Sequence, residues 1–509
     1  MYTERPGGIY VSILLVLLCA LISTLQPPAA AAVSNPPGND EAAGQAYPHD
    51  ERSARADQLF EPWDRRDSPG AALGIFKDGR IIYARGYGMA NLEYHIPITP
   101  STVFRVGSVS KQFTAMAVSL LAQSGKISLD DDIRKYLPEL PDYGRPITIR
   151  HLIHHTSGIR DYLTLQFLGG RDDDYFYTPQ EVIDLLARQE EVNFTPGDKF
   201  LYSNSGYFLL AEIVARASGM KTRDFAAKKI FEPLEMSHTH FHDQRNRIVR
   251  DRASGYAPEG NGYRIDMTQL EMIGDGRVFT TVEDMFRWDQ NFYDNKLGNG
   301  GPELIDTILT RGRLNDGTRL DYAFGLTVST YRGERTIGHG GSFVGFRAAY
   351  LQFPDYRFSV VVLANLSTVN PSRLCRSIAD IYLEDQFTEP VVEESPADRV
   401  GGDNASGEGS ELTATKLREY AGDYFSNELQ VTYRLRIQDG KLLLAVRTMP
   451  EALLTPVSVD QFRVDERRLQ FLRDGDGKVS GFTLQAGRVR NLKFERRTPK
   501  SLSAHFSSS

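Results

Sequence analysis

Hydrophobic residues follow two different spacings along residues 51–387, which predicts a large domain that mixes helices and strands. Apolar side chains recur three and four positions apart over residues 113–121 and again over residues 207–217. That spacing places them on one face of a helix, and the second segment stops before a glycine, as helices commonly do. Thr281, followed by Asp284 three positions later, predicts the start of another helix.

Three segments of the same region have the composition of strands. Residues 71–76 and 81–84 flank an Asp-Gly pair at positions 78 and 79, which predicts a β-hairpin. Residues 358–364 are almost all apolar and predict a buried strand. Because helices lie between these strands in the sequence, we expect an α/β (α+β) domain in which helices flank one antiparallel sheet.

Residues 411–498 have a different pattern and predict a second, smaller domain. Short runs of β-type composition follow one another at 429–437, 441–446, 462–464, 469–472, 479–484 and 489–494. Asp-Gly pairs at 439–440 and 476–477 fit turns between them, so we expect a small antiparallel barrel or sandwich. Residues 388–410 are acidic, lack aromatic side chains and end in glycine and serine, which predicts a linker.

The N-terminal residues have the pattern of an export signal. Residues 9–25 form an uncharged, mostly apolar run, with Arg5 before it and two prolines and four alanines after it. We therefore expect a signal peptide over residues 1–32, a flexible lead-in over 33–50, and a secreted or periplasmic protein. The alternative is an uncleaved membrane anchor, because the run is only slightly shorter than a spanning helix.

Charge and cysteine content exclude several classes of function. The chain has 59 basic against 66 acidic residues, a net charge of −7, so it offers no broad cationic surface for nucleic acid. Its two cysteines, Cys19 and Cys375, exclude a disulfide scaffold and a thiolate zinc site. His238, His240 and His242 alternate as on one face of a strand, but no carboxylate scaffold is evident beyond Asp243, so we predict neither a metal nor a cofactor.

A Ser-x-x-Lys element at Ser108 and Lys111 is the first candidate for chemistry. Residues three apart share a helix face, so the amine can lie beside the hydroxyl and activate it. The helix N-terminus favours a developing alkoxide, and Gly107 allows close approach of a substrate. Ser218 and Lys221 have the same spacing, but they lie where a helix ends, so we expect them to be structural.

Two further elements complete the candidate site. Tyr202 and Asn204 precede a helix, where a phenol beside cations can transfer a proton and an amide can both donate and accept hydrogen bonds. His339 precedes two glycines and Ser342, which predicts a strand edge kept bare for a substrate. We expect Gly341 and Ser342 to contact the substrate, and the amides of Ser342 and Ser108 to serve as oxyanion donors.

In this order the three elements resemble the serine β-lactamase and penicillin-binding-protein-like family of hydrolases, nearest the class C β-lactamase, esterase and D-aminopeptidase branch. Residues 104–108, 148–158, 194–204 and 274–284 carry more of the resemblance, which covers residues 57–382. The smaller domain resembles the lipocalin-like β-barrel that follows this domain in some members.

The resemblance implies a mechanism. Ser108 would attack a carbonyl carbon and form an acyl-enzyme, while Lys111 and Tyr202 would share the proton transfers. Asn204 would hold Lys111 or the substrate amide, and His339 would contact a substrate carboxylate or tune Tyr202. Lactam-cleaving members have lysine where this sequence has His339, and lysine is a permanent charge whereas histidine is mostly neutral at pH 7.

This departure favours a peptidase, D-amino-acid amidase or esterase over a true β-lactamase. Two other possibilities stay open: a penicillin-binding sensor that is acylated with little turnover, and a role of the barrel in binding a partner or forming a homo-oligomer. The predicted partner is otherwise a small-molecule or peptide substrate.

Overall fold

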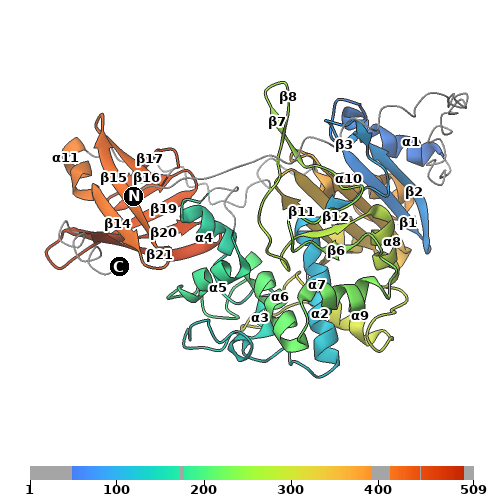
Figure 1. Cartoon of the computed structure of the whole chain (residues 1–509), viewed down its shortest axis with the longest axis horizontal. Coiled ribbons are helices and arrows are strands. Elements are labelled where there is room, and N and C mark those ends of the chain that lie inside the picture. Colours follow the sequence, from blue (N-terminus) through green and yellow to red (C-terminus); the bar gives the residue numbers. More distant parts are fainter. Residues whose placement is uncertain (1–46, 48, 172–176, 391–412, 448, 498–509) are drawn as a thin grey trace, which may run out of the picture. The chain divides into compact units, whose positions relative to one another are not determined.

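The structure, a computed structural model, describes residues 47, 49–171, 177–390, 413–447 and 449–497 (Figure 1). The predicted signal peptide and almost all of the predicted lead-in and linker lie outside these residues. Within the described ranges, none of the helices combines the length and apolar character needed to cross a bilayer.

A six-stranded antiparallel sheet forms the centre of the larger region, with strand order β10-β11-β12-β13-β1-β2. β1 and β13 lie side by side, so the first and last strands of the region meet in register, with Ala71 opposite Ala364. The predicted hairpin and the predicted buried strand are both confirmed. The strands are β1 Ala71–Lys77, β2 Arg80–Tyr87, β10 Thr327–Tyr331, β11 Glu334–Phe343, β12 Phe346–Phe353 and β13 Phe358–Ala364.

Helices cover both faces of this sheet, as predicted. Asp289, near the end of α8 (Val282–Gln290), accepts hydrogen bonds from Gln352 and Ser359, which lie opposite each other on β12 and β13. Cys375 in α10 (Pro371–Tyr382) contacts the backbone of the same strands at Ala349 and Val360. A Cβ on Gly340, which lies opposite Ala349, would be 3.3 Å from Ser372 Oγ of α10. Position 349 and Gln352 point to opposite faces of β12, so α8 and α10 cover different faces of the sheet.

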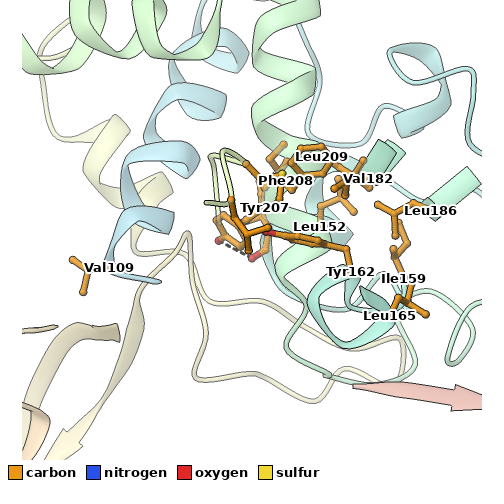
Figure 2. Close-up of a cluster of buried hydrophobic side chains, with 14 of the residues drawn as sticks. Val109, Leu152, Ile159, Tyr162, Leu165, Val182, Leu186, Tyr207, Phe208 and Leu209 are labelled. Atoms are coloured by element: carbon orange, nitrogen blue, oxygen red, sulfur yellow. Dashed lines mark hydrogen bonds between the residues drawn. The ribbon is translucent and has the colours of Figure 1, made fainter. Parts of the chain in front are cut away.

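A helical layer packs beside the sheet around the buried helices α2 and α6, both of which the apolar spacing predicted. Figure 2 shows its core, where apolar side chains of α3, α4, α5 and α6 converge. α6 ends at Gly219, whose φ of 72° is left-handed. The helices are α1 Glu51–Gln58, α2 Lys111–Gln123, α3 Ile149–Ile153, α4 Tyr162–Leu168, α5 Pro179–Ala187, α6 Asn204–Ser218, α7 Thr222–Ala226 and α9 Glu303–Ile308.

Short strands connect the two layers. β5 (Phe104–Arg105), β9 (Val278–Thr280) and β6 (His240–Phe241) form a small three-stranded sheet directly before the Ser108 segment. Two further pairs are β3 Met89–Asn91 with β4 Ile96–Pro97, and β7 Tyr256–Glu259 with β8 Gly262–Ile265. The small sheet fixes the backbone on either side of the candidate site.

The C-terminal residues form a closed antiparallel barrel of eight strands rather than a sandwich. The predicted runs match six of them, and β14 and β17 were missed because each is interrupted by glycine, proline or polar residues. Aromatic side chains fill the interior. The strands are β14 Gly422–Ser426, β15 Val431–Gln438, β16 Lys441–Val446, β17 Ala452–Ser458, β18 Gln461–Val464, β19 Arg467–Arg473, β20 Val479–Ala486 and β21 Val489–Arg497.

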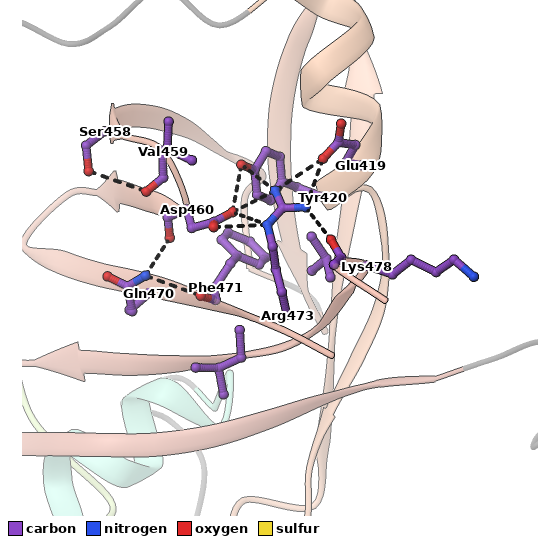
Figure 3. Close-up of polar contacts among 12 residues, drawn as sticks. Glu419, Tyr420, Ser458, Val459, Asp460, Gln470, Phe471, Arg473 and Lys478 are labelled. Atoms are coloured by element: carbon purple, nitrogen blue, oxygen red, sulfur yellow. Dashed lines mark hydrogen bonds and ion pairs between the residues drawn. The ribbon is translucent and has the colours of Figure 1, made fainter. Parts of the chain in front are cut away.

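A polar cluster at one end of the barrel ties the segment before β14 to the strands (Figure 3). Arg473 on β19 donates to both carboxylate oxygens of Asp460 and to the carboxylate of Glu419. Tyr420, which follows α11 (Ala414–Leu417), also donates to Asp460, at 2.9 Å. One guanidinium therefore holds three separate segments together.

Buried histidines predict a loss of stability in acid. Burial lowers the pKa of six histidines. The pKa falls to about 4 for His154, His240 and His339 and to about 3 for His242. It is also lowered for His151 and His155. Between pH 6.5 and their lowered pKa values, these side chains bind protons in the unfolded chain but not in the folded one. Their stabilising contribution is therefore complete above pH 6.5 and is lost as the pH falls, by about 1.4 kcal/mol per group and pH unit.

Buried carboxyls oppose this effect but are fewer. Burial raises the pKa of Asp275 and Asp289 to about 6, and it also raises the pKa of Asp284 and Glu212. Since these groups bind protons first in the folded state, they add stability as the pH falls below about 6. The six histidines outnumber them, so the urea midpoint should be lower at pH 5 than at pH 7.5. His240→Gln should make the drop in urea midpoint between pH 7.5 and pH 5 smaller. A wild-type midpoint that stays constant or rises toward pH 5 would contradict the prediction.

Candidate active site

A cavity of about 700 Å³ lies where the helical layer meets the edge of the sheet that carries β11. Six of the seven residues predicted to form a site line this cavity, together with Gly107: Ser108, Tyr202, Asn204, His339, Gly341 and Ser342. The seventh, Lys111, is fully buried directly behind Ser108. The structure therefore brings all three sequence elements to one place.

Lys111 is the first residue of α2, one turn after Ser108 in the 3₁₀ segment Gly107–Ser110. Its Nζ donates to Ser108 Oγ at 3.2 Å, to Asn204 Oδ1 at 2.9 Å and to the carbonyl oxygen of Asp275 at 2.7 Å. An ammonium group has three protons, and all three find acceptors here. Three acceptors thus hold Lys111 Nζ in place, and one of them is the Ser108 hydroxyl.

Two glycines allow β11 to lie directly against the Ser108 segment. A Cβ on Gly341 would lie 2.0 Å from the carbonyl oxygen of Val106 and 3.2 Å from the amide nitrogen of Ser108. A Cβ on Gly107, whose φ is +50°, would lie 2.8 Å from the amide nitrogen of Ser342. Because only glycine permits this approach, the backbones of Ser108 and Ser342 lie together at the cavity wall.

His339 is held as a neutral imidazole. Its Nδ1 lies 2.5 Å from the carbonyl oxygen of Gly340, to which it can only donate, and its Nε2 lies 3.0 Å from the hydroxyl of Tyr322. Burial, together with the charge of Lys111, lowers the pKa of His339 to about 4. At pH 7 this residue is therefore not a permanent cation for a substrate carboxylate.

The Tyr322 hydroxyl fixes the orientation of His339, so its removal should impair the site. Tyr322→Phe should lower kcat/KM about tenfold, because Nε2 loses its donor. The same loss removes a hydrogen bond that favours the neutral imidazole, so the acid limb of the pH profile should move to higher pH. Tyr136→Phe, which removes a hydroxyl bonded to Asp131 elsewhere, is the matched control. Equal profiles for the two variants would contradict this role.

Tyr202 lies between a histidine and two cations. The ring of His155 packs on it with 4.2 Å between ring centroids, and Nδ1 of His155 accepts the Ser203 amide at 3.1 Å. Lys111 Nζ lies 4.8 Å from the Tyr202 ring centroid, and Cζ of Arg488 lies 4.7 Å from it. His155 therefore packs against the Tyr202 ring and also holds the backbone beside it.

Sequence reasoning missed several residues that hold the site. The carboxyl group of Asp275 accepts the Tyr162 hydroxyl at 3.0 Å while its carbonyl holds Lys111. Asp161 accepts the backbone amide of Asn204 at 2.7 Å, at the start of α6. Asp275 lies in a segment that carried the family resemblance, whereas Arg488, from the turn before β21, had no local signal at all.

The other residues that the sequence singled out for possible chemistry lie outside this cavity. Ser218 ends α6 and bonds to neighbouring backbone groups, as expected for a structural residue. In the described part of the chain, no group of three or more histidine, cysteine or carboxylate side chains is arranged to hold a metal ion. Nε2 of His240 lies 3.2 Å from Nδ1 of His242, so these two imidazoles bond to each other.

Comparison with known proteins identifies the family. Residues 56–381 match the family described as Beta-lactamase, which is more than half of the 509 residues. This chain therefore belongs to the beta-lactamase family.

Its relatives carry two kinds of name. Penicillin-binding protein 4* of Bacillus subtilis (strain 168) is 31% identical over 329 residues, covering 60% of this chain and 70% of that protein. D-aminopeptidase of Brucella anthropi is 30% identical over 303 residues, covering 58% of this chain and 56% of that protein. The chain thus spans little more than half the length of the D-aminopeptidases that it matches.

Solved structures agree on the fold. An octameric penicillin-binding protein homologue from Pyrococcus abyssi has a TM-score of 0.58 at 24% identity, covering 87% of this chain and 99% of that one. A D-amino acid amidase from Ochrobactrum anthropi SV3 has a TM-score of 0.54 at 21% identity, covering 66% of this chain and 98% of that one.

Proposed function

We propose that this protein is an exported serine hydrolase that cleaves an amide or peptide bond beside a D-amino acid, through an acyl-enzyme on Ser108. The observation that carries the proposal is the contact of the buried Lys111 ammonium with the Ser108 hydroxyl at the wall of an open cavity. A hydroxyl beside a fixed cation is stabilised as it becomes an alkoxide. D-Aminopeptidases among the relatives support the substrate class.

In the proposed first step, Tyr202 acts as a phenolate: Ser108 Oγ attacks the carbonyl carbon while its proton passes to the Tyr202 oxygen, which becomes a neutral phenol. We assign the proton to Tyr202 because all three protons of Lys111 are already donated, which leaves Lys111 to stabilise negative charge. The amides of Ser108 and Ser342 donate to the oxyanion. Tyr202 returns the proton to the leaving amine as the C–N bond breaks, and water then cleaves the ester by the same route in reverse.

The neutral His339 favours an amide or ester of a D-amino acid over a β-lactam. A lactam-cleaving site benefits from a permanent cation at the position that begins the third element, and His339 does not supply one at pH 7.

A substrate panel tests this proposal. The purified protein lacking residues 1–32 is assayed with matched D- and L-alanine and phenylalanine p-nitroanilides, a p-nitrophenyl ester and a chromogenic cephalosporin. We expect the D-anilide to have the highest kcat/KM among the amides, and Ser108→Ala to abolish its hydrolysis. Equal rates for D- and L-anilides, or a preference for the cephalosporin, would overturn the substrate assignment.

A penicillin-binding sensor is the second candidate, favoured by the relative named penicillin-binding protein 4*. A labelled penicillin separates the two functions, because a sensor gives a long-lived adduct on Ser108 with negligible turnover of every substrate in the panel. A homo-oligomer is a further proposal, suggested by the octameric homologue of similar fold, and light scattering of the full chain would measure its mass.

A further inference from the structure

A second cavity, of about 150 Å³, lies behind the small β5-β9-β6 sheet and has a strongly basic lining. Four arginines and one histidine face it: Arg105, Arg245, Arg252, Arg277 and His242. No aspartate or glutamate is among its lining residues in the described part of the chain. We call it the arginine cavity.

Two of these arginines are buried with unpaired N–H groups. Arg277 is 3% exposed, and its Nε and Nη1 have no hydrogen-bond partner within the described residues. Arg105 is 6% exposed, and its Nε is likewise unpaired there. Burial lowers the pKa of Arg105 to about 9 and that of Arg277 to about 10, so both remain charged at pH 7. Cζ of Arg105 lies 4.2 Å from the ring centroid of Phe343, but this contact supplies no acceptor for its Nε. A buried N–H group without an acceptor is costly, which points to a missing anion.

The nearby acidic side chains are committed to other groups. Asp275 accepts the Tyr162 hydroxyl, Asp243 pairs with Arg223 at 2.6 Å, and Glu271 accepts the backbone amide of Arg245 at 2.8 Å. Within the described residues, none of them accepts a hydrogen bond from Arg105 Nε or from Arg277 Nε or Nη1. Asp275 therefore attracts Arg105, and Glu271 and Asp243 attract Arg277, only at longer range, and the unpaired N–H groups keep no acceptor within the described residues.

We propose that the arginine cavity binds a small oxyanion, a carboxylate or phosphate group, between the guanidinium groups of Arg277 and Arg105. Planar guanidinium groups match the paired oxygens of such anions, and the volume suits a single group of this size. The anion has two conceivable sources. It is either a free ion or the acidic end of a substrate, because Arg105 lines both this cavity and the main one.

Thermal unfolding tests binding without reference to activity. Phosphate and citrate are titrated against the full chain at pH 7.5, with sodium chloride added to equal ionic strength. A site in the folded state should raise the Tm in a saturable manner, by roughly 4 °C at a hundredfold excess over Kd.

Arg277→Met should abolish this rise, and it should leave the Tm without added anion unchanged or higher, because it removes an unpaired buried charge. A merely structural arginine would instead lower that Tm. Arg252→Met, at an exposed lining position, should weaken binding several-fold without endangering the fold. Arg80→Met, an exposed arginine on β2, is the matched control. No saturable rise in the wild type, or an equal rise in Arg277→Met, would overturn the proposal.

Kinetics then identify the source of the anion. If the cavity holds the acidic end of a substrate, phosphate should raise KM for an acidic acyl group such as a D-glutamyl anilide, but not for the D-alanyl anilide. If the anion is a free ion, phosphate should affect both substrates equally. The kinetic experiment rests on the proposed function, whereas the thermal unfolding experiment does not. Failure of the anion site can therefore be distinguished from failure of the proposed function.

Discussion

Ser108→Ala should lower kcat/KM for the best substrate by about 10⁴-fold or more while leaving the fold intact. The hydroxyl is the group that forms the covalent bond in the proposed mechanism, and no neighbouring side chain can replace it. The variant removes one acceptor, 3.2 Å from Lys111 Nζ, and Lys111 keeps Asn204 and Asp275 as partners. The Tm should therefore stay within a few degrees of that of the wild type.

Ser124→Ala, at the other end of α2, is the control for this substitution, because its hydroxyl lies far along the same helix and bonds only to backbone. Its activity should equal that of the wild type. Retained hydrolysis in Ser108→Ala, with a wild-type Tm, would show that the reaction does not use this hydroxyl.

Lys111→Met should lower kcat/KM by about 10³-fold. The substitution keeps much of the side-chain volume but removes the charge that faces Ser108, and loss of one such stabilising group commonly costs two to three orders of magnitude. It also leaves the Asn204 amide oxygen and the Asp275 carbonyl without their donor. We expect the loss to be in kcat more than in KM, since the charge acts on the developing alkoxide.

Lys111→Arg separates charge from geometry. Arginine retains the charge, but its larger planar head does not fit the three acceptors that surround Nζ, so activity should stay at least tenfold below that of the wild type. Lys126→Met, an exposed lysine just beyond α2, should behave as the wild type. A Lys111→Met enzyme with full kcat would exclude the proposed stabilising role.

Local sequence signals predicted the parts of the fold that local interactions determine. The Asp-Gly turn predicted the β1-β2 hairpin, and Asp78 and Gly79 both have the positive φ that such a turn requires. Thr281 does begin α8, with its side chain accepting the Asp284 amide. The strand β17 was missed because Pro456 and polar neighbours interrupt it, and its place is fixed by pairing with β16 and β18.

The site could be predicted only where short motifs carry it. Ser108 and Lys111 are one helical turn apart, and the glycines of β11 mark a close approach of backbones, so both are visible in the sequence. Tyr322 and Arg488 come from distant segments and reach the site through tertiary packing. In a sequence, an arginine such as Arg277 looks like any surface arginine. Only the folded chain shows that its side chain is buried and that its Nε and Nη1 have no hydrogen-bond partner within the described residues.

Covalent trapping tests the central claim most directly. The protein is incubated with a fluorophosphonate probe, digested, and examined by mass spectrometry to locate the modified residue. The account predicts one adduct, on the peptide that contains Ser108, and no adduct in Ser108→Ala. An adduct on another residue, or equal labelling of Ser108→Ala, would contradict it.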